Sequence, residues 1–246
     1  MNFYNEHDPK AAAWLRELIK HEHIPAGIVD ERSIEDIRPS ELDGFTQCHF
    51  FAGIGGWSLA LRLAGWPENR PVWTGSCPCQ PFSSAGKGGG FADERHLWPA
   101  FYHIISSQRT PPVVFGEQVA SVTALAWLDL VRDDMERAGY AFGAADLCAA
   151  SVGARHIRQR IWWVANPIGE RGCSGKLERE HAVDADARSQ ASGSDWLRCG
   201  ETVEPCPAPL VDGFPGRLGL LRPYGNAIVP QVAAQFIRAY CETMTP

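Results

Sequence analysis

The chain lacks the sequence features of membrane and secreted proteins. None of its apolar runs is long enough to cross a bilayer. The first stretch, residues 1–8, does not show the basic and then apolar pattern of a signal peptide. We therefore expect a soluble intracellular protein, located in the cytoplasm and without a membrane partner.

The chain also has no excess of basic residues. Its formal net charge is −6, which argues against a protein that coats nucleic acid through bulk charge. A local basic cleft is still compatible with this net charge. Any binding of nucleic acid must therefore use positive residues that gather in one place.

Cysteine pairs with the spacing of a metal site are scarce. The eight cysteines are scattered through a chain that can form a core without disulfides, so we expect free thiols in a reducing compartment. Cys77 and Cys79 could belong to a metal site, but no second pair has convincing ligand spacing. Further along, four possible ligands match no compact pattern either: Cys173, His181, Cys199 and Cys206. We therefore expect no metal.

What the chain does have is an alternation of predicted strands and helices. Its length suits one catalytic domain with a small insert, and alternating elements indicate an α/β fold with a parallel sheet. Asp8 and Pro9 predict the start of a helix that reaches about residue 22. The predicted strands are 45–51, 71–74, 113–115, about 140–145 and about 160–165; further helices follow Gly56, Leu97, Ser121 and the 226–231 stretch.

Three unusual segments follow predicted strands: 52–56, 75–83 and 116–119. Ligands of parallel α/β sheets bind at the carboxyl ends of strands, so these segments are expected at one edge. The first, Ala52-Gly-Ile-Gly-Gly56, allows a tight turn and close approach of a ligand to the backbone at a helix N-terminus. An ordinary strand-to-helix turn would explain the same glycines.

The second segment, Gly75-Ser-Cys-Pro-Cys-Gln-Pro-Phe-Ser83, presents Cys79 between two prolines. Pro78 and Pro81 stiffen the backbone on both sides of the thiol, which suits a nucleophile. A buried structural cysteine or a metal pair with Cys77 are the alternatives.

Five short motifs together resemble the DNA cytosine C5-methyltransferases. They occur in that family's order across residues 50–240, and five in order are far more specific than any one of them. The motifs are Phe51-Ala-Gly-Ile-Gly-Gly56, Pro78-Cys-Gln-Pro-Phe-Ser83, Gly116-Glu-Gln-Val119, Arg158-Gln-Arg160 and Gly225-Asn-Ala-Ile-Val229. The resemblance implies a Rossmann-like S-adenosylmethionine-dependent methyltransferase sheet, in a bacterial or phage-infected cell.

The resemblance also implies the chemistry. Cys79 would add as a thiolate to C6 of a cytosine flipped out of double-stranded DNA, and C5 would then accept a methyl group from S-adenosylmethionine. Glu117 would contact the base at N3 and its amino group, and Arg158 and Arg160 would hold the base oxygen and a phosphate. Residues 83–96 would close over the DNA, although their composition also fits a plain loop. The residues expected around the cofactor are Phe51, Gly53, Ile54, Gly55, Gly56, Pro78, Leu97, Asn226 and Ala227.

The chain departs from the family in several places. Gln118 replaces an asparagine, and Arg155 and His156 replace a proline and a glutamine. Only residues 57–74 separate the glycine turn from Gly75, where the family places two further strands, so we expect a sheet reduced in strand number. We hypothesise that residues 22–44 pack beside the strand 45–51 and supply the missing wall, with Asp30, Glu31 and Asp36 as candidates for the adenosine contacts. A charged surface linker is the alternative reading of this segment.

The predicted organisation is a catalytic domain over residues 1–165, a small target-recognition insert over 166–222, and a return to the catalytic domain over 223–246. The insert is short and not basic, so recognition of the target or binding of the cofactor could depend on a partner subunit; otherwise we expect a monomer. Two other functions stay open. One is the same adduct chemistry on RNA or with a different C5 group, and the other is a DNA-binding relic without catalysis.

Overall fold

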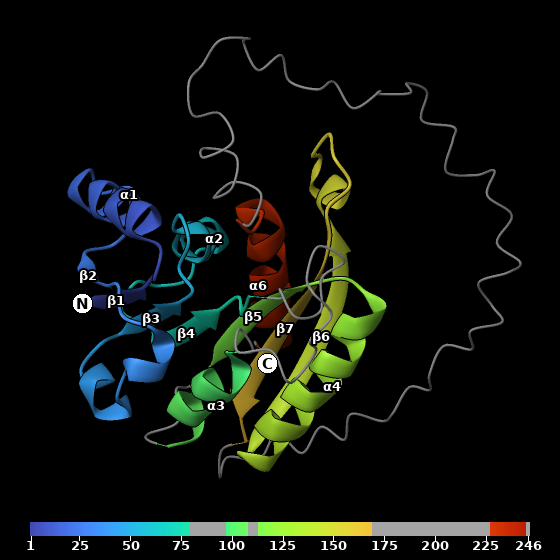
Figure 1. The fold of residues 1–246 in the computed structure, drawn as a ribbon. Helices are drawn as coiled ribbons and strands as arrows, with labels where there is room; N and C mark the ends of the chain where they lie inside the picture. The colour runs from blue at the N-terminus through green and yellow to red at the C-terminus, as the bar shows by residue number, and fades with distance from the viewer. Residues whose placement is uncertain (79–96, 108–112, 169–226, 245–246) are drawn as a thin grey trace, which may run out of the picture. The chain divides into compact units, whose positions relative to one another are not determined.

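The computed structural model describes residues 1–78, 97–107, 113–168 and 227–244, without the side chains of 122–123. In this part of the chain seven strands form one sheet in the order β2-β1-β3-β4-β5-β7-β6, with helices on both faces (Figure 1). The strands are β1 (Asn2–Asn5), β2 (Gly27–Asp30), β3 (Gln47–Phe50), β4 (Val72–Gly75), β5 (Val114–Val119), β6 (Tyr140–Cys148) and β7 (Gln159–Pro167). The helices are α1 (Pro9–Lys20), α2 (Gly56–Ala64), α3 (Trp98–Ser106), α4 (Val122–Arg137) and α6 (Pro230–Met244), and short 3-10 turns are η1 (Ile34–Asp36), η2 (Pro39–Leu42) and η4 (Ala149–Val152).

The five strands from β2 to β5 run parallel, as the sequence predicts for an α/β fold. The last two strands differ, because β7 pairs antiparallel with β5 and β6 pairs antiparallel with β7. In this register Val119, the last residue of β5, lies opposite Arg160 near the start of β7. The start of β7 therefore lies at the edge where the parallel strands end.

Two strands of the sheet come from the chain before the glycine turn. β1 pairs with β3, with Asn5 opposite Phe50, and β2 pairs with the other side of β1. Residues 57–74 contain only most of α2 and most of β4, as the short spacing predicts. The sheet nevertheless has seven strands, because β1 and β2 are added to it, so the expectation of a reduced strand number was wrong. The segment hypothesised to lie beside β3 is also corrected: β1 occupies this place, and β2 lies outside it.

The ends of the helices follow local side-chain chemistry. Asp8 accepts hydrogen bonds from the backbone N–H groups of Lys10 (2.8 Å) and Ala11 (3.1 Å), so α1 begins at Pro9 as predicted. Gly65 closes α2 in the left-handed conformation, with φ of 76°. None of the helices in the described ranges is long and apolar enough to span a membrane.

Side chains alternate between the two faces of the sheet, as the period of a strand requires. On β5, Val114 packs in the cluster that includes α3 and α4, whereas Phe115 packs with α2 and α6. On β7, Trp163 packs in the cluster with α3 and α4, whereas Trp162 packs with α2 and α6. The central strands are therefore buried on both faces, and polar groups at their ends can meet only along one edge.

Gly116, between these two layers on β5, tests this packing. A Cβ at Gly116 would lie 2.0 Å from Cε2 of the buried Trp163, whereas a Cβ at Gly143 on β6 would meet nothing closer than 3.9 Å. We expect Gly116→Ala to lower the free energy of unfolding by about 2 kcal/mol or more, because a rigid ring must move. Gly143→Ala, the matched control, should change it by less than about 1 kcal/mol. Urea denaturation measures both, and equal effects would contradict this account.

Candidate functional site

A cleft of about 690 Å³ follows the edge where the parallel strands end. Its lining comes from the ends of β1, β3, β4 and β5, the start of β7 and the segment before α6. One end of the cleft contains the glycine turn and Glu6, and the other contains Glu117, Arg158 and Arg160.

The glycine turn has a backbone that other residues would not adopt easily. Gly53 and Gly55 have φ of 57° and 84°, and Gly55 is the N-cap of α2. A Cβ on Gly56 would lie 2.7 Å from Cγ1 of Ile228, which precedes α6. Phe51 also has a positive φ, 53°, which is unusual for a bulky residue and marks a strained position at the cleft. An ordinary strand-to-helix turn would not require a positive φ at a bulky residue such as Phe51.

Glu6 is a site residue that the sequence analysis missed. Directly after β1, its Oε2 accepts a hydrogen bond from the Gly53 N–H at 2.6 Å, and its Oε1 accepts one from the Asp8 N–H at 2.8 Å. Both bonds fix the carboxylate at the cleft wall. A carboxylate near a glycine turn is the usual partner of ribose hydroxyls in nucleotide-binding sheets, but there it follows the turn by about 20 residues. Here it precedes the turn by 47 residues.

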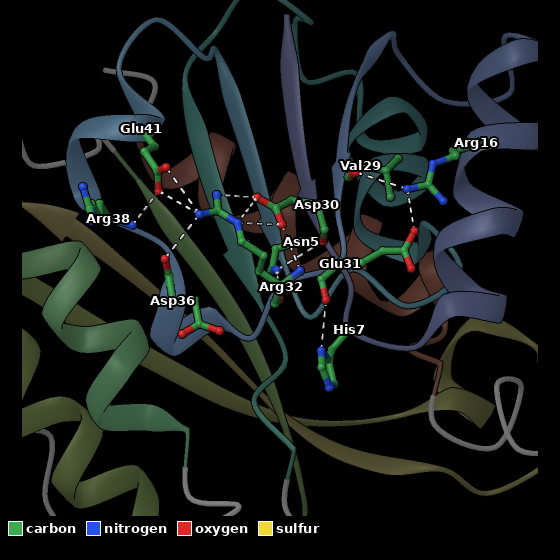
Figure 2. A network of polar contacts seen from close by, with 10 residues as sticks. All are labelled: Asn5, His7, Arg16, Val29, Asp30, Glu31, Arg32, Asp36, Arg38 and Glu41. Atoms are coloured by element: carbon green, nitrogen blue, oxygen red, sulfur yellow. Dashed lines mark hydrogen bonds and ion pairs between the residues drawn. The ribbon is translucent and has the colours of Figure 1, made fainter.

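The acidic residues after β2 form a separate network (Figure 2). Arg32 binds the carboxylate of Asp30 at 2.7 Å and that of Glu41 at 3.3 Å. Burial raises the pKa of Asp30, but the hydrogen bonds from Arg32 outweigh it and hold that pKa below its usual range. Asp30 is therefore a carboxylate with its charge already compensated by a neighbouring arginine.

The other two candidates of this segment also face away from the cleft lining. Glu31 pairs with Arg16 on α1 at 2.6 Å, and the backbone carbonyl of Asp36 accepts from Arg32 at 3.4 Å (Figure 2). Neither these two residues nor Asp30 lines the cleft, whereas Ser33 and Ile34 do. The segment therefore reaches the cleft through the loop that the acidic network braces.

Asn5 ties this loop to the sheet. Its side-chain amide donates to the backbone carbonyls of Asp30 at 3.3 Å and Arg32 at 2.9 Å. Because Asn5 is the last residue of β1 and Glu6 follows it, the same strand end positions both the loop and the carboxylate.

At the other end of the cleft, Glu117 is a buried carboxylate. Its Oε1 lies 2.9 Å from Nε of Arg160, and the Ser76 hydroxyl also donates to it. Trp57 donates its indole N–H to the Ser76 oxygen at 3.0 Å, which leaves the hydroxyl proton free to point at Glu117. Burial raises the pKa of Glu117, against the opposing effects of Arg160 and Arg158. The protonated acid is thus more populated here than on an exposed glutamate.

Arg158 lies on the same side of the cleft. Its guanidinium donates to the backbone carbonyl of Ala227 at 2.8 Å, which ties the start of β7 to the segment before α6. Burial and the neighbouring Arg160 lower the pKa of Arg158, and Glu117 opposes this. The three side chains form one electrostatic unit with more positive than negative charge.

Gln118 and Cys77 support the backbone that leads to Cys79. The Gln118 amide donates to the Cys77 carbonyl at 3.5 Å, so the departure from asparagine at this position gives a contact between β5 and the end of β4. Burial raises the pKa of the Cys77 thiol, so Cys77 is a poor nucleophile. Ser76 and Pro78 line the cleft, and Cys79 itself lies outside the described residues.

Most of the residues expected at the site lie together along this cleft. Gly55, the N-cap of α2, instead lines a neighbouring groove. Asn226, residues 83–96 and the four possible metal ligands lie outside the described residues. In the described ranges there is no cluster of metal-binding side chains. The expected residues that line the cleft are Phe51, Gly53, Ile54, Gly56, Pro78, Leu97, Glu117, Arg158, Arg160 and Ala227.

Comparisons with known proteins agree with the resemblance that the motifs show. Residues 67–180 match the family described as C-5 cytosine-specific DNA methylase. The chain is 29% identical over 169 residues to the type II methyltransferase M.HhaI of Haemophilus parahaemolyticus, covering 52% of this chain and 51% of that protein. It is 26% identical over 161 residues to the type II methyltransferase M.NgoMIV of Neisseria gonorrhoeae, covering 49% and 51%.

Among solved structures, a mutant of Spodoptera frugiperda DNMT2 aligns with 15% identity and a TM-score of 0.45, covering 72% of this chain and 53% of that chain. The chain spans about half the length of the curated relatives named above. The family model and both curated relatives are named as methyltransferases or methylases, which is the activity that the motifs led us to expect. Over residues 67–180 the chain is thus similar to the C-5 cytosine-specific DNA methylases, a family whose members use S-adenosylmethionine as methyl donor.

Proposed function

We propose that this chain transfers a methyl group from S-adenosylmethionine to C5 of cytosine in double-stranded DNA, through a covalent bond between Cys79 and C6. The observation that carries this proposal is the single cleft that joins the Glu6–Gly53 corner to the Glu117–Arg160 pair. A nucleoside and a base can lie at its two ends with their reacting atoms between them.

The Glu6 end suits the adenosine of the cofactor. Ribose hydroxyls can donate to the Glu6 carboxylate, which two backbone N–H groups already hold in place. Phe51 and Ile34 offer apolar surface for a purine ring. Asp30 and Asp36 then act on the adenosine by shaping the loop that carries Ser33 and Ile34. When bound, S-adenosylmethionine supplies an electrophilic methyl group.

The Glu117 end suits a cytosine. A protonated Glu117 can donate to N3 and accept from the exocyclic amino group, and a cationic arginine can donate to O2. Nucleophilic attack on the ring places negative charge on these atoms, so the excess positive charge of Arg158 and Arg160 stabilises the adduct. The raised pKa of Glu117 favours the protonated form that this contact needs.

Cys79 directly follows Pro78, which lines the cleft. Its thiolate would bond to C6, and the electron pair of the C5–C6 double bond would then take the methyl group of S-adenosylmethionine, whose sulfur–methyl bond breaks so that S-adenosylhomocysteine leaves. The C5 proton leaves to a base, the bond between sulfur and C6 breaks, and the thiolate is restored. Because C5 is not accessible in a stacked duplex, the target base must leave the helix. We place recognition of the target sequence in residues 166–222.

The assignment of the nucleophile can be tested with 5-fluorocytosine, whose C5 fluorine blocks the elimination step and traps the adduct. We expect Cys79→Ser to form no covalent adduct with duplex DNA containing this base in the presence of S-adenosylmethionine. Cys77→Ala is the matched control and should still form it, since the Gln118 contact uses the Cys77 backbone. Denaturing gel electrophoresis measures the adduct. An adduct with Cys79→Ser, or one formed by the wild type only with RNA, would contradict the proposal.

The role of Glu117 predicts a pH-dependent loss in Glu117→Gln. We expect the single-turnover rate of methyl transfer to fall about 100-fold or more, because the variant cannot supply the proton. As the pH rises through the raised pKa of Glu117, the wild type loses its protonated form and its advantage over the variant should shrink. Rapid-quench measurements over a range of pH give the ratio. A ratio that is constant or grows with pH would show that the charged form is the active one.

The role of Glu6 predicts a weaker cofactor. We expect Glu6→Gln to raise the Kd of S-adenosylmethionine about tenfold, because hydrogen bonds to a charged group are lost. Glu17→Gln, on the exposed side of α1, should leave the Kd unchanged. Asp30→Ala and Asp36→Ala should have smaller effects than Glu6→Gln. Titration calorimetry decides: if Asp30→Ala weakens binding more than Glu6→Gln, the adenosine contact belongs to Asp30.

A further inference from the structure

The connection between β6 and β7 extends beyond the ends of the other strands (Figure 1). Its base is held by backbone and side-chain hydrogen bonds. The Ala149 N–H donates to the Arg158 carbonyl at 3.1 Å, and the Gln159 amide donates to the Asp146 carboxylate at 2.7 Å. Gly153 turns the chain with φ of 84°. The exposed residues 155–157 therefore follow a firm support.

Ile157 lies at the end of this connection with 85% of its surface exposed. It is the most exposed of the large apolar side chains in the described part of the chain. A single exposed apolar side chain is common on protein surfaces and says little by itself. Its neighbours give it meaning.

Those neighbours are basic residues. Arg155 and His156 are exposed directly before Ile157, and Arg158 and Arg160 follow it. Residues 149–160 contain no aspartate or glutamate, although the whole chain has a formal net charge of −6. This connection is therefore a local concentration of positive charge of the kind that a polyanion needs.

The end of the connection also contributes to the lining of the cleft. Arg158 lines the cleft and, with His156, a second groove of about 680 Å³. The two hollows share Ile54, Gly56, Arg158, Ala227 and Ile228, so they meet beside this connection. A duplex that delivers a base to Glu117 has to approach the cleft next to this connection.

We infer that Ile157 enters the duplex beside the target cytosine, while Arg155 and His156 contact the flanking phosphates. This inference rests on the proposed function. Proteins that distort DNA insert apolar side chains between base steps and surround them with cations. The contact would stabilise the distorted duplex from which the cytosine has left, so it would assist extrusion of the base rather than the chemistry on it.

Extrusion costs less when the target base is already mispaired. We therefore compare adduct formation by Ile157→Ala on 5-fluorocytosine opposite guanine and opposite adenine. We expect the rate to fall about tenfold with the paired target and to stay within about twofold with the mispaired one, relative to wild type. Ile157→Leu should restore most of the rate. Ile28→Ala, at an exposed position on β2, is the control and should change neither rate.

Arg155→Ala tests the phosphate contact separately from the insertion of Ile157 into the duplex. We expect it to weaken binding of both duplexes equally and to lower the slope of log affinity against log salt by about 0.9. Equal loss on both duplexes with Ile157→Ala, or no loss on either, would overturn the assignment of Ile157. If the wild type formed no adduct with either duplex, the proposed function would be overturned, and the inference about Ile157 with it.

Discussion

The hydrogen bond from the Gly53 N–H to the Glu6 carboxylate joins the two parts of the chain that build one end of the cleft. It exists because β1 pairs with β3 and ends at the same level, with Asn5 opposite Phe50. Glu6, directly after β1, and Gly53, three residues after the end of β3, then reach the same corner. Asn5 adds the loop after β2 to this corner through its two backbone contacts. One strand of four residues thus organises the carboxylate, the glycine turn and the loop.

The Glu117 end of the cleft is built in a different way. Glu117 is buried beside two arginines, and burial of a charged group is costly unless it is paired and hydrogen-bonded. Such an arrangement is a weak source of stability but a common feature of reaction sites, where it shifts the pKa of a carboxyl group. The antiparallel direction of β7 is what brings Arg160 to Glu117, since its first residues meet the last residues of β5. The reversal of one strand therefore completes the site.

The region matched by the family begins at residue 67, after β1, α1, β2, β3 and α2. In the family that the motifs resemble, two strands lie between the glycine turn and the cysteine loop. Here the β1–α1–β2 unit comes before the glycine turn, yet it lies in the same sheet beside β3.

The sequence by itself determined the elements whose causes are local. Asp8 and Pro9 set the start of α1, Gly65 ended α2, and the alternation of strands and helices predicted the parallel sheet. The motifs also indicated the cleft residues, because the first two follow β3 and β4 and the third ends β5. Only the tertiary structure revealed Glu6, since β1 is too short for a periodic pattern and its partner Gly53 is 47 residues away. It also decided that Arg32 compensates Asp30 and that Gln118 reaches Cys77, because these contacts depend on strand pairing and on loops that no local pattern describes.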